Sequence, residues 1–202
     1  DDLSAGSLQL KFDELLNPEK LSMMKSNCLK ITDGKGLFRF TLSLVGDLLS
    51  LLRIRKVDVG DSALLFEWKN DSVTRKNSFN TALILLADHE KWLTGKMSRL
   101  DSCKMFIVEV GPISIGQVRF DLSTNGNWRI DYSVAPFCRG FGFAKKLLVL
   151  GVMELRKLHP DCVIIAEVKE TNVASMRAFE STGFTVCEQK IKNVTVYKYG
   201  GL

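Results

Sequence analysis

The feature that most constrains the fold is a strand, a glycine-bearing turn and an amphipathic helix in immediate succession between residues 128 and 148. Trp128 to Val134 reads as a β-strand, and Gly140 and Gly142 mark the turn. After the turn, small and apolar residues recur at steps of three and four, as on one face of a helix: Ala144, Leu147, Leu148, Gly151, Leu155 and Leu158. Such a turn aims backbone N–H groups and the positive end of a helix dipole at one spot. The segment therefore predicts an anion-binding site.

The residue types in the turn suit a diphosphate. Gly140 and Gly142 have no Cβ to keep a ligand away from the backbone, Ala144 lets the helix begin close to it, and Arg139 can add a charge-assisted contact. Glycine in a strand-to-helix turn also has a purely steric explanation, and the pair alone does not separate the two interpretations.

The rest of the chain from residue 53 alternates short strands and helices. Lys104 to Val110, Ile113 to Phe120 and Trp128 to Val134 are β-like runs joined by turn residues, which predicts an antiparallel meander. The further elements expected after the long helix are a buried strand over Cys162 to Val168, a helix over Asn172 to Ser181, and a closing hairpin over Phe184 to Tyr199 turned at Lys192 and Asn193. The fold class is α/β in the broad sense, with a mixed sheet flanked by helices.

The first part of the chain has a different pattern. Residues 1–52 show helical periodicity over Asn17 to Met24 and Phe38 to Leu52 without a clear hairpin, so we expect a helical extension ahead of a domain at 53–202. Within that domain, the expected elements before the meander are a strand over Leu52 to Arg55, a helix capped by Asp61 and Ser62 that runs to Trp68, and a helix capped by Asp88.

Composition excludes several classes of protein. The formal net charge of +5 is spread along the chain rather than gathered in a basic run, so no nucleic-acid partner is expected. The five cysteines form no C-x-x-C pair and only two histidines accompany them, which argues against a metal site or a disulfide framework. Without a run of roughly 20 apolar residues or a basic leader, we expect no membrane partner and a cytoplasmic location. The oligomeric state stays open, with a homodimer among the alternatives.

Two spaced motifs resemble the GNAT superfamily of acetyltransferases. The family's pyrophosphate loop has Arg or Gln, two residues, Gly, one residue, then Gly or Ala, and Arg139, Gly142 and Ala144 match each fixed position. The segment Glu170 to Phe184 is similar to the family's asparagine-initiated helix that ends in Gly-Phe. The resemblance implies an acetyl-CoA-dependent N-acetyltransferase with the GNAT fold.

The resemblance also implies which residues meet the coenzyme. Val134 would pair its backbone with pantetheine at the end of a strand that splays from its neighbour, Asn172 would meet the pantetheine arm, and Ser175 would lie close to the coenzyme. The pyrophosphate would be held by the backbone of the loop residues Arg139, Gly140, Phe141, Gly142, Phe143 and Ala144. An ordinary helix N-cap is the alternative for Asn172.

The proton chemistry departs from the family pattern. Many members have a tyrosine seven residues after the helix asparagine as general acid, but that position is Phe179, which cannot donate a proton. Tyr132 on the central strand is the best substitute, and Glu109 and Asp131 are candidate bases. Each of the three could equally be an ordinary strand residue.

The acceptor side resembles one branch of the family. The pattern Trp68-x-Asn70, then Arg75, then His89-x-x-Trp92 is similar to the acetyltransferases of nucleotide-linked amino-deoxysugars in pseudaminic acid biosynthesis. It implies a UDP-amino-sugar as acceptor, with Asn70, Arg75, His89 and Trp92 near it. The alternatives are that His89 is a surface residue and that the tryptophans belong to the core.

The N-terminal extension carries a second resemblance to the same pathway. Met23-Met24-Lys25, Ile31 to Gly36 and Arg39 are similar to the tail of the pathway's UDP-sugar hydrolase, which would make residues 1–52 the remnant of an upstream domain. Two rival functions remain: acetylation of a protein N-terminus or another small amine, and a non-catalytic acyl-CoA-binding module.

Overall fold

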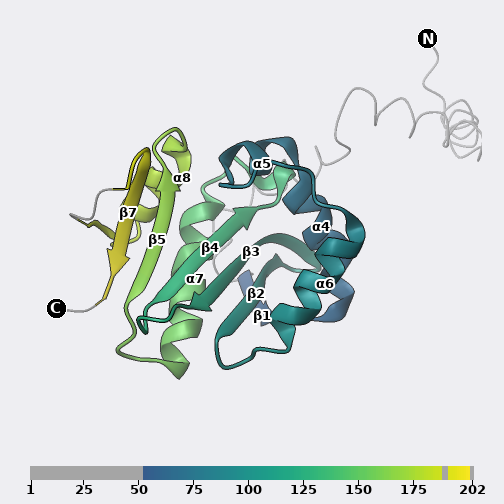
Figure 1. The fold of residues 1–202 in the computed structure, drawn as a ribbon, viewed down its shortest axis with the longest axis horizontal. Coiled ribbons are helices and arrows are strands. Elements are labelled where there is room, and N and C mark those ends of the chain that lie inside the picture. The colour runs from purple at the N-terminus through teal and green to yellow at the C-terminus, as the bar shows by residue number, and fades with distance from the viewer. Residues whose placement is uncertain (1–51, 188–190, 201–202) are drawn as a thin grey trace, which may run out of the picture. The chain divides into compact units, whose positions relative to one another are not determined.

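The computed structural model describes residues 52–187 and 191–200, in which one mixed seven-stranded sheet is flanked by helices (Figure 1). The strands follow the spatial order β1-β2-β3-β4-β5-β7-β6. Their bounds are β1 (Leu52–Lys56), β2 (Cys103–Val110), β3 (Ile113–Leu122), β4 (Trp128–Val134), β5 (Ile164–Lys169), β6 (Thr185–Val186) and β7 (Val194–Tyr199). All neighbouring pairs are antiparallel except β4 and β5, which are parallel.

The helices cover both faces of this sheet. They are η2 (Val59–Asp61), α4 (Ser62–Asn70), α5 (Ser72–Asn77), α6 (Leu86–Met97), η3 (Pro136–Cys138), α7 (Phe143–Leu158) and α8 (Val173–Glu180). Gly151 of α7 packs against Val118 of β3, whereas Lys96 of α6 forms an ion pair with Asp121 of the same strand. Because successive strand residues point to opposite faces, α7 and α6 lie on opposite sides of the sheet. In Figure 1, α4 and α6 lie in front of the strands and α7 passes behind them.

Helix α7 forms the centre of the core on its side. The four residues Leu147, Leu148, Val152 and Leu155 recur at helical spacing and are all buried. Gly151 packs tightly against the sheet, since a Cβ there would lie 2.7 Å from a methyl carbon of Val118. The tight contact fixes where the N-terminus of α7 points.

The predicted fold class, meander, long helix and closing strands are confirmed, with local differences. Helix α5 was not predicted. The prediction that Asp88 caps the helix around His89 is wrong, because α6 begins at Leu86 with Leu85 as its N-cap. Asp61 does precede α4, but its carboxylate accepts hydrogen bonds from Arg55 and from the Asp58 N–H instead of capping that helix.

The predicted helices over Asn17 to Met24 and Phe38 to Leu52 lie outside the described residues, except that Leu52 begins β1. All the described residues belong to one compact unit, which begins at Asp47. Across residues 52–187 and 191–200, no helix is long and apolar enough to span a membrane, and no group of side chains could hold a metal ion.

Candidate active site

Strands β4 and β5 separate soon after they begin. Their parallel pairing covers only Trp128 with Ile164 and Arg129 with Ile165. The Trp128 N–H donates to the Val163 carbonyl (2.9 Å), while the Ala135 N–H donates to the opposite side, to the Ile115 carbonyl (2.8 Å). Backbone groups alternate along a strand, so Val134 shares the orientation of Trp128 and its N–H and carbonyl face the β5 side beyond the last pair. The predicted splay is present, and the backbone groups of Val134 that face it have no partner among the described residues.

The turn before α7 leaves open space above its glycines. Gly140 and Gly142 adopt positive φ angles of 85° and 75°, and a Cβ built on either would meet no protein atom within 4 Å. The positive φ alone explains the choice of glycine. The open space is a separate observation, and it gives a ligand access to the backbone.

The N-terminus of α7 is uncapped. Gly142 occupies the N-cap position without a side-chain hydrogen bond, and the first turn contains no acidic residue. The first N–H groups of a helix have no intrahelical acceptor and carry partial positive charge. Lys145 and Lys146 add two cationic side chains in the same turn. A diphosphate such as that of coenzyme A fits this combination of free donors, positive charge and open backbone.

Arg139 is engaged in a contact that the sequence did not predict. Its Nη2 lies 2.6 Å from an Asp71 carboxylate oxygen and donates to the Thr74 hydroxyl (2.8 Å). Burial acts to raise the pKa of Asp71, but the hydrogen bonds from Arg139 and the Thr74 N–H outweigh it and lower that pKa below its ordinary 3.8. The guanidinium expected on a phosphate is therefore bound to α5, while its backbone stays in the loop.

The second predicted coenzyme segment, at the start of α8, lies beside Tyr132 of β4. The Asn172 side chain caps α8 by accepting from the Ser175 N–H (3.2 Å), which is the structural role considered for it. The Tyr132 ring contacts Phe179 edge to face, with 5.5 Å between centroids. Burial raises the pKa of Tyr132 and nearby Asp131 adds to the rise, while a hydrogen bond with the Ser175 hydroxyl opposes it. The phenol is therefore protonated at neutral pH.

The candidate bases lie on the other face of the sheet and are both ion-paired. Glu109 accepts from Arg55 Nε (2.8 Å), and Asp131 accepts from Arg119 Nη2 (2.8 Å). Asp131 and Tyr132 are consecutive on β4, so their side chains point to opposite faces. Tyr132 faces α7 and α8, whereas the carboxylates face the layer of α4 and α6.

Two of the four residues expected at the acceptor hold the loop between α5 and α6. The Asn70 amide donates to the Ile84 carbonyl and accepts from the Ile84 N–H, both at 2.9 Å. Arg75 donates to the carbonyls of Asn70 and Thr81, each at 3.1 Å. These hydrogen bonds hold the loop in place, because the exposed loop lacks apolar packing.

The other two residues differ in exposure. His89 is 2% exposed and its Nε2 lies 2.9 Å from the Ser62 carbonyl, so its ring is a satisfied core group rather than the acceptor contact or surface residue considered from the sequence. Trp68 is likewise buried. Trp92 is 36% exposed, and the Arg119 guanidinium lies 5.3 Å from its ring centroid. Trp92 thus has a partly exposed ring, although Arg119 and His89 both contact it.

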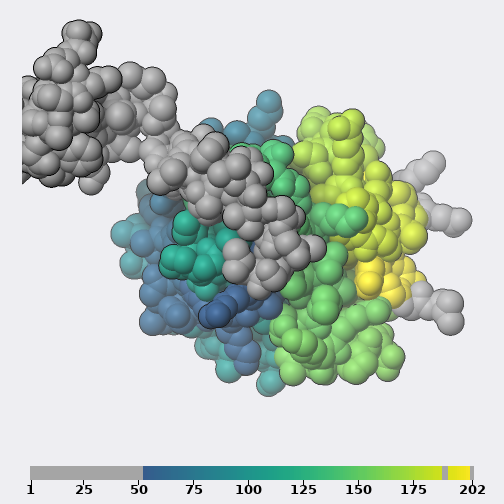
Figure 2. Space-filling model, turned by 180° about the vertical axis from the view of Figure 1, so that it is seen from behind, coloured from purple at the N-terminus to yellow at the C-terminus, as the bar shows by residue number. Residues whose placement is uncertain are grey.

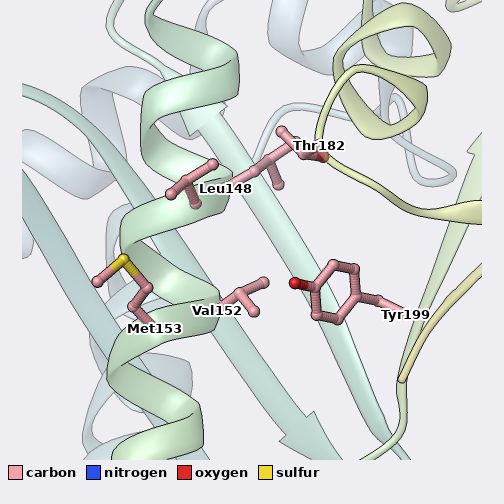
Figure 3. A pocket seen from close by; sticks show the side chains of 6 residues that line it. Leu148, Val152, Met153, Thr182 and Tyr199 are labelled. Carbon is pink, nitrogen blue, oxygen red and sulfur yellow. The ribbon is translucent and has the colours of Figure 1, made fainter. Parts of the chain in front are cut away.

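A shallow pocket lies elsewhere, on the back of the molecule, where green α7 runs beside the yellow C-terminal strands (Figure 2). It is lined by Leu148, Val149, Val152, Met153, Thr182 and Tyr199 (Figure 3). Except for two hydroxyl groups, this lining offers no group for acid–base chemistry, and it flanks the middle of α7 rather than its N-terminus. We do not assign the reaction to it.

Comparisons with known proteins agree with the geometry. Residues 52–185 match the model of an acetyltransferase (GNAT) domain, while no curated protein matches the chain.

Among solved structures, the spermidine N-acetyltransferase from Vibrio cholerae in complex with CoA and spermine is similar with a TM-score of 0.65 at 19% identity, covering 74% of this chain and 94% of that one. The ribosomal-protein-alanine N-acetyltransferase from Brucella melitensis gives 0.62 at 21% identity (73% and 99% covered). The Campylobacter jejuni N-acetyltransferase PseH gives 0.57 at 16% identity (74% and 98% covered). The chain belongs to the GNAT family and is an acetyl-CoA-dependent N-acetyltransferase.

Proposed function

We propose that the acceptor is the primary amine of a UDP-linked amino-deoxysugar. The observation that carries this proposal is Trp92, a partly exposed indole next to the Arg119 guanidinium on the face of the sheet opposite α7. An aromatic face suits the apolar face of a sugar or a base, and charged neighbours suit its hydroxyl or phosphate edge. The likeness to PseH shows a shared fold, and the sequence pattern around Trp92 supplies the link to sugar acceptors.

We assign the coenzyme and the acceptor to opposite faces of the sheet. Acetyl-CoA supplies a thioester that an amine can attack. We assign the diphosphate to the first turn of α7, and the pantetheine to the free backbone of Val134, whose N–H can also stabilise the oxyanion that forms on the carbonyl. The acceptor then approaches from the side of α4 and α6.

The proposed general acid and the proposed bases also lie on opposite faces of the sheet. Tyr132 lies against Phe179, the residue at the family's usual tyrosine position, and holds a proton that it can give to the leaving thiolate. Asp131 and Glu109 lie on the side that we assign to the acceptor, where one of them can take the proton that the acceptor's ammonium must lose before the neutral amine attacks. The Asp131 side chain is 42% exposed against 20% for Glu109, so Asp131 is the more accessible base.

A peptide amine is the second candidate, and one observation favours it. Four apolar side chains before and at the start of α6 are half exposed or more: Phe79, Leu83, Leu85 and Leu86. An apolar surface of this kind suits a peptide better than a sugar.

Thiol release from acetyl-CoA in the presence of single acceptors separates these candidates. The panel contains a UDP-amino-deoxysugar, spermidine, an aminoglycoside and a peptide with a free N-terminus. We expect turnover with the UDP-amino-deoxysugar and a KM for it that rises about tenfold in W92A, while the KM for acetyl-CoA is unchanged. Turnover with the peptide alone would move the assignment to protein N-termini. Coenzyme binding without turnover on any amine would contradict both.

A further inference from the structure

Helix α5 has no apolar anchor. It is six residues long, from Ser72 to Asn77, and none of these residues is buried. A helix of this length is not stable by itself in water, and helices in proteins are normally held by a buried apolar face. The position of α5 therefore depends on polar contacts: Arg75 binds the neighbouring carbonyls of Asn70 and Thr81, and the contacts from distant parts of the chain lie at the two ends of the helix.

The N-terminal contact comes from the coenzyme loop. Asp71 caps α5 by accepting from the Thr74 N–H (2.9 Å), and the same carboxylate oxygen lies 2.6 Å from Arg139 Nη2. Arg139 also donates to the Thr74 hydroxyl (2.8 Å). A bond between a guanidinium and a partly buried carboxylate is among the stronger polar contacts in proteins.

The C-terminal contact comes from the end of β5. The Lys169 ammonium donates to the Lys76 carbonyl (3.2 Å) and to the Ser78 carbonyl. A cation suits this position because the carbonyls at a helix C-terminus carry partial negative charge. The Lys169 carbonyl accepts from the Asn172 N–H (2.8 Å), so this contact belongs to the segment that begins α8.

The two cations stand on opposite sides of the gap between the diverging strands. Arg139 follows β4 and Lys169 ends β5, and both reach α5, which lies near the ends of these strands (Figure 1). We propose that Asp71 and Lys169 are positioning residues that hold α5 across the open end of this gap. The helix then acts as a strut that sets the width of the gap and holds the coenzyme loop in its binding conformation. The inference is independent of the acceptor, since coenzyme A alone tests it.

The experiment compares D71N, K169M, K169R and the double variant D71N/K169M. Coenzyme A affinity is measured by titration calorimetry, and hydrogen exchange is followed over residues 72–78. We expect D71N and K169M each to weaken coenzyme A binding about tenfold and to speed exchange in α5, as loss of one charged hydrogen bond would. K169R keeps a cationic donor at the carbonyls and should bind like the wild type.

The double variant tests the strut itself. Asp71 and Lys169 act on one helix, so releasing the second end should add little, and the double variant should also lose about tenfold rather than a hundredfold. K157M is the matched control, because Lys157 makes an exposed ion pair with Glu154 in the last turn of α7. It should change neither coenzyme affinity nor exchange in α5.

Three results would overturn the proposal. They are unchanged affinity in K169M, additive losses in the double variant, and unaltered exchange over residues 72–78 in both single variants. A wild-type protein that does not bind coenzyme A would instead refute the coenzyme site, so the two failures are distinguishable.

Discussion

Replacing Gly142 with alanine tests whether the backbone of the turn contacts the coenzyme. Gly142 has φ 75°, and Gly126 in the β3–β4 turn has φ 83°. Both are exposed, and a Cβ at either would meet no protein atom within 4 Å. G142A and G126A therefore carry the same conformational cost, and only G142A places a methyl group where we expect the diphosphate.

The magnitudes follow from these two facts. Alanine in the left-handed region costs about 1–2 kcal/mol, and the loss of freedom in the unfolded chain offsets part of this, so each variant should lose about 1 kcal/mol of unfolding free energy. Displacing the diphosphate from one backbone donor removes a hydrogen bond to a charged group, which corresponds to about a 10- to 100-fold weaker affinity. That second loss should occur in G142A alone.

Urea titration measures the stability and calorimetric titration with coenzyme A measures the affinity. G142N is a useful third variant because asparagine tolerates positive φ, so it should recover stability without recovering affinity. If G142A bound coenzyme A as tightly as G126A, the turn would hold no diphosphate and the assignment of the site would be refuted.

Three further predictions concern the phenols of Tyr132 and Tyr197 and the packing of α7. Y132F should lower kcat about a hundredfold. Because the pKa of Tyr132 is raised above the ordinary tyrosine value of 10.0, the wild-type rate should not fall until the pH exceeds 10.0. A rate that already declines at a lower pH would contradict the role of Tyr132 as the acid. Burial and the hydrogen bond to Glu180 (2.9 Å) raise the pKa of Tyr197 to about 12, so its contribution to stability is complete below pH 10 and is lost as the pH rises towards 12. Urea titrations should thus find Y197F about 1 kcal/mol less stable at pH 7 but not at pH 12. G151A should be destabilising despite its better helix propensity, because its Cβ would meet Val118, and V118A should suppress the effect in a double-mutant cycle of unfolding free energies.

The local structure around the coenzyme loop could be predicted because its signals are local. Glycine at positive φ, apolar residues at helical spacing and turn residues between β-like runs each depend on the neighbouring sequence alone. Helix α5 was missed because it buries no residue and so leaves no apolar pattern, although Asp71 followed by Ser72 was a capping signal that could have revealed it.

The acceptor residues could not be predicted in the same way. His89, Asn70 and Arg75 have polar side chains that suit a substrate, but in the fold they satisfy carbonyls and a backbone N–H of their own layer. A polar residue type does not tell whether its partner will be a ligand or another part of the chain, because the partner is often distant in sequence.

The sequence by itself determined the order of the strands, the long helix after them and the glycine turn, since short-range sterics and hydrophobic periodicity specify these features. Only the tertiary structure decided that Arg139 binds Asp71, that Lys169 reaches the far end of α5, and that Tyr132 stands beside Phe179. These contacts join residues far apart in the chain, and their geometry depends on how far β4 and β5 diverge. That divergence is a property of the packed sheet, and no local stretch of residues encodes it.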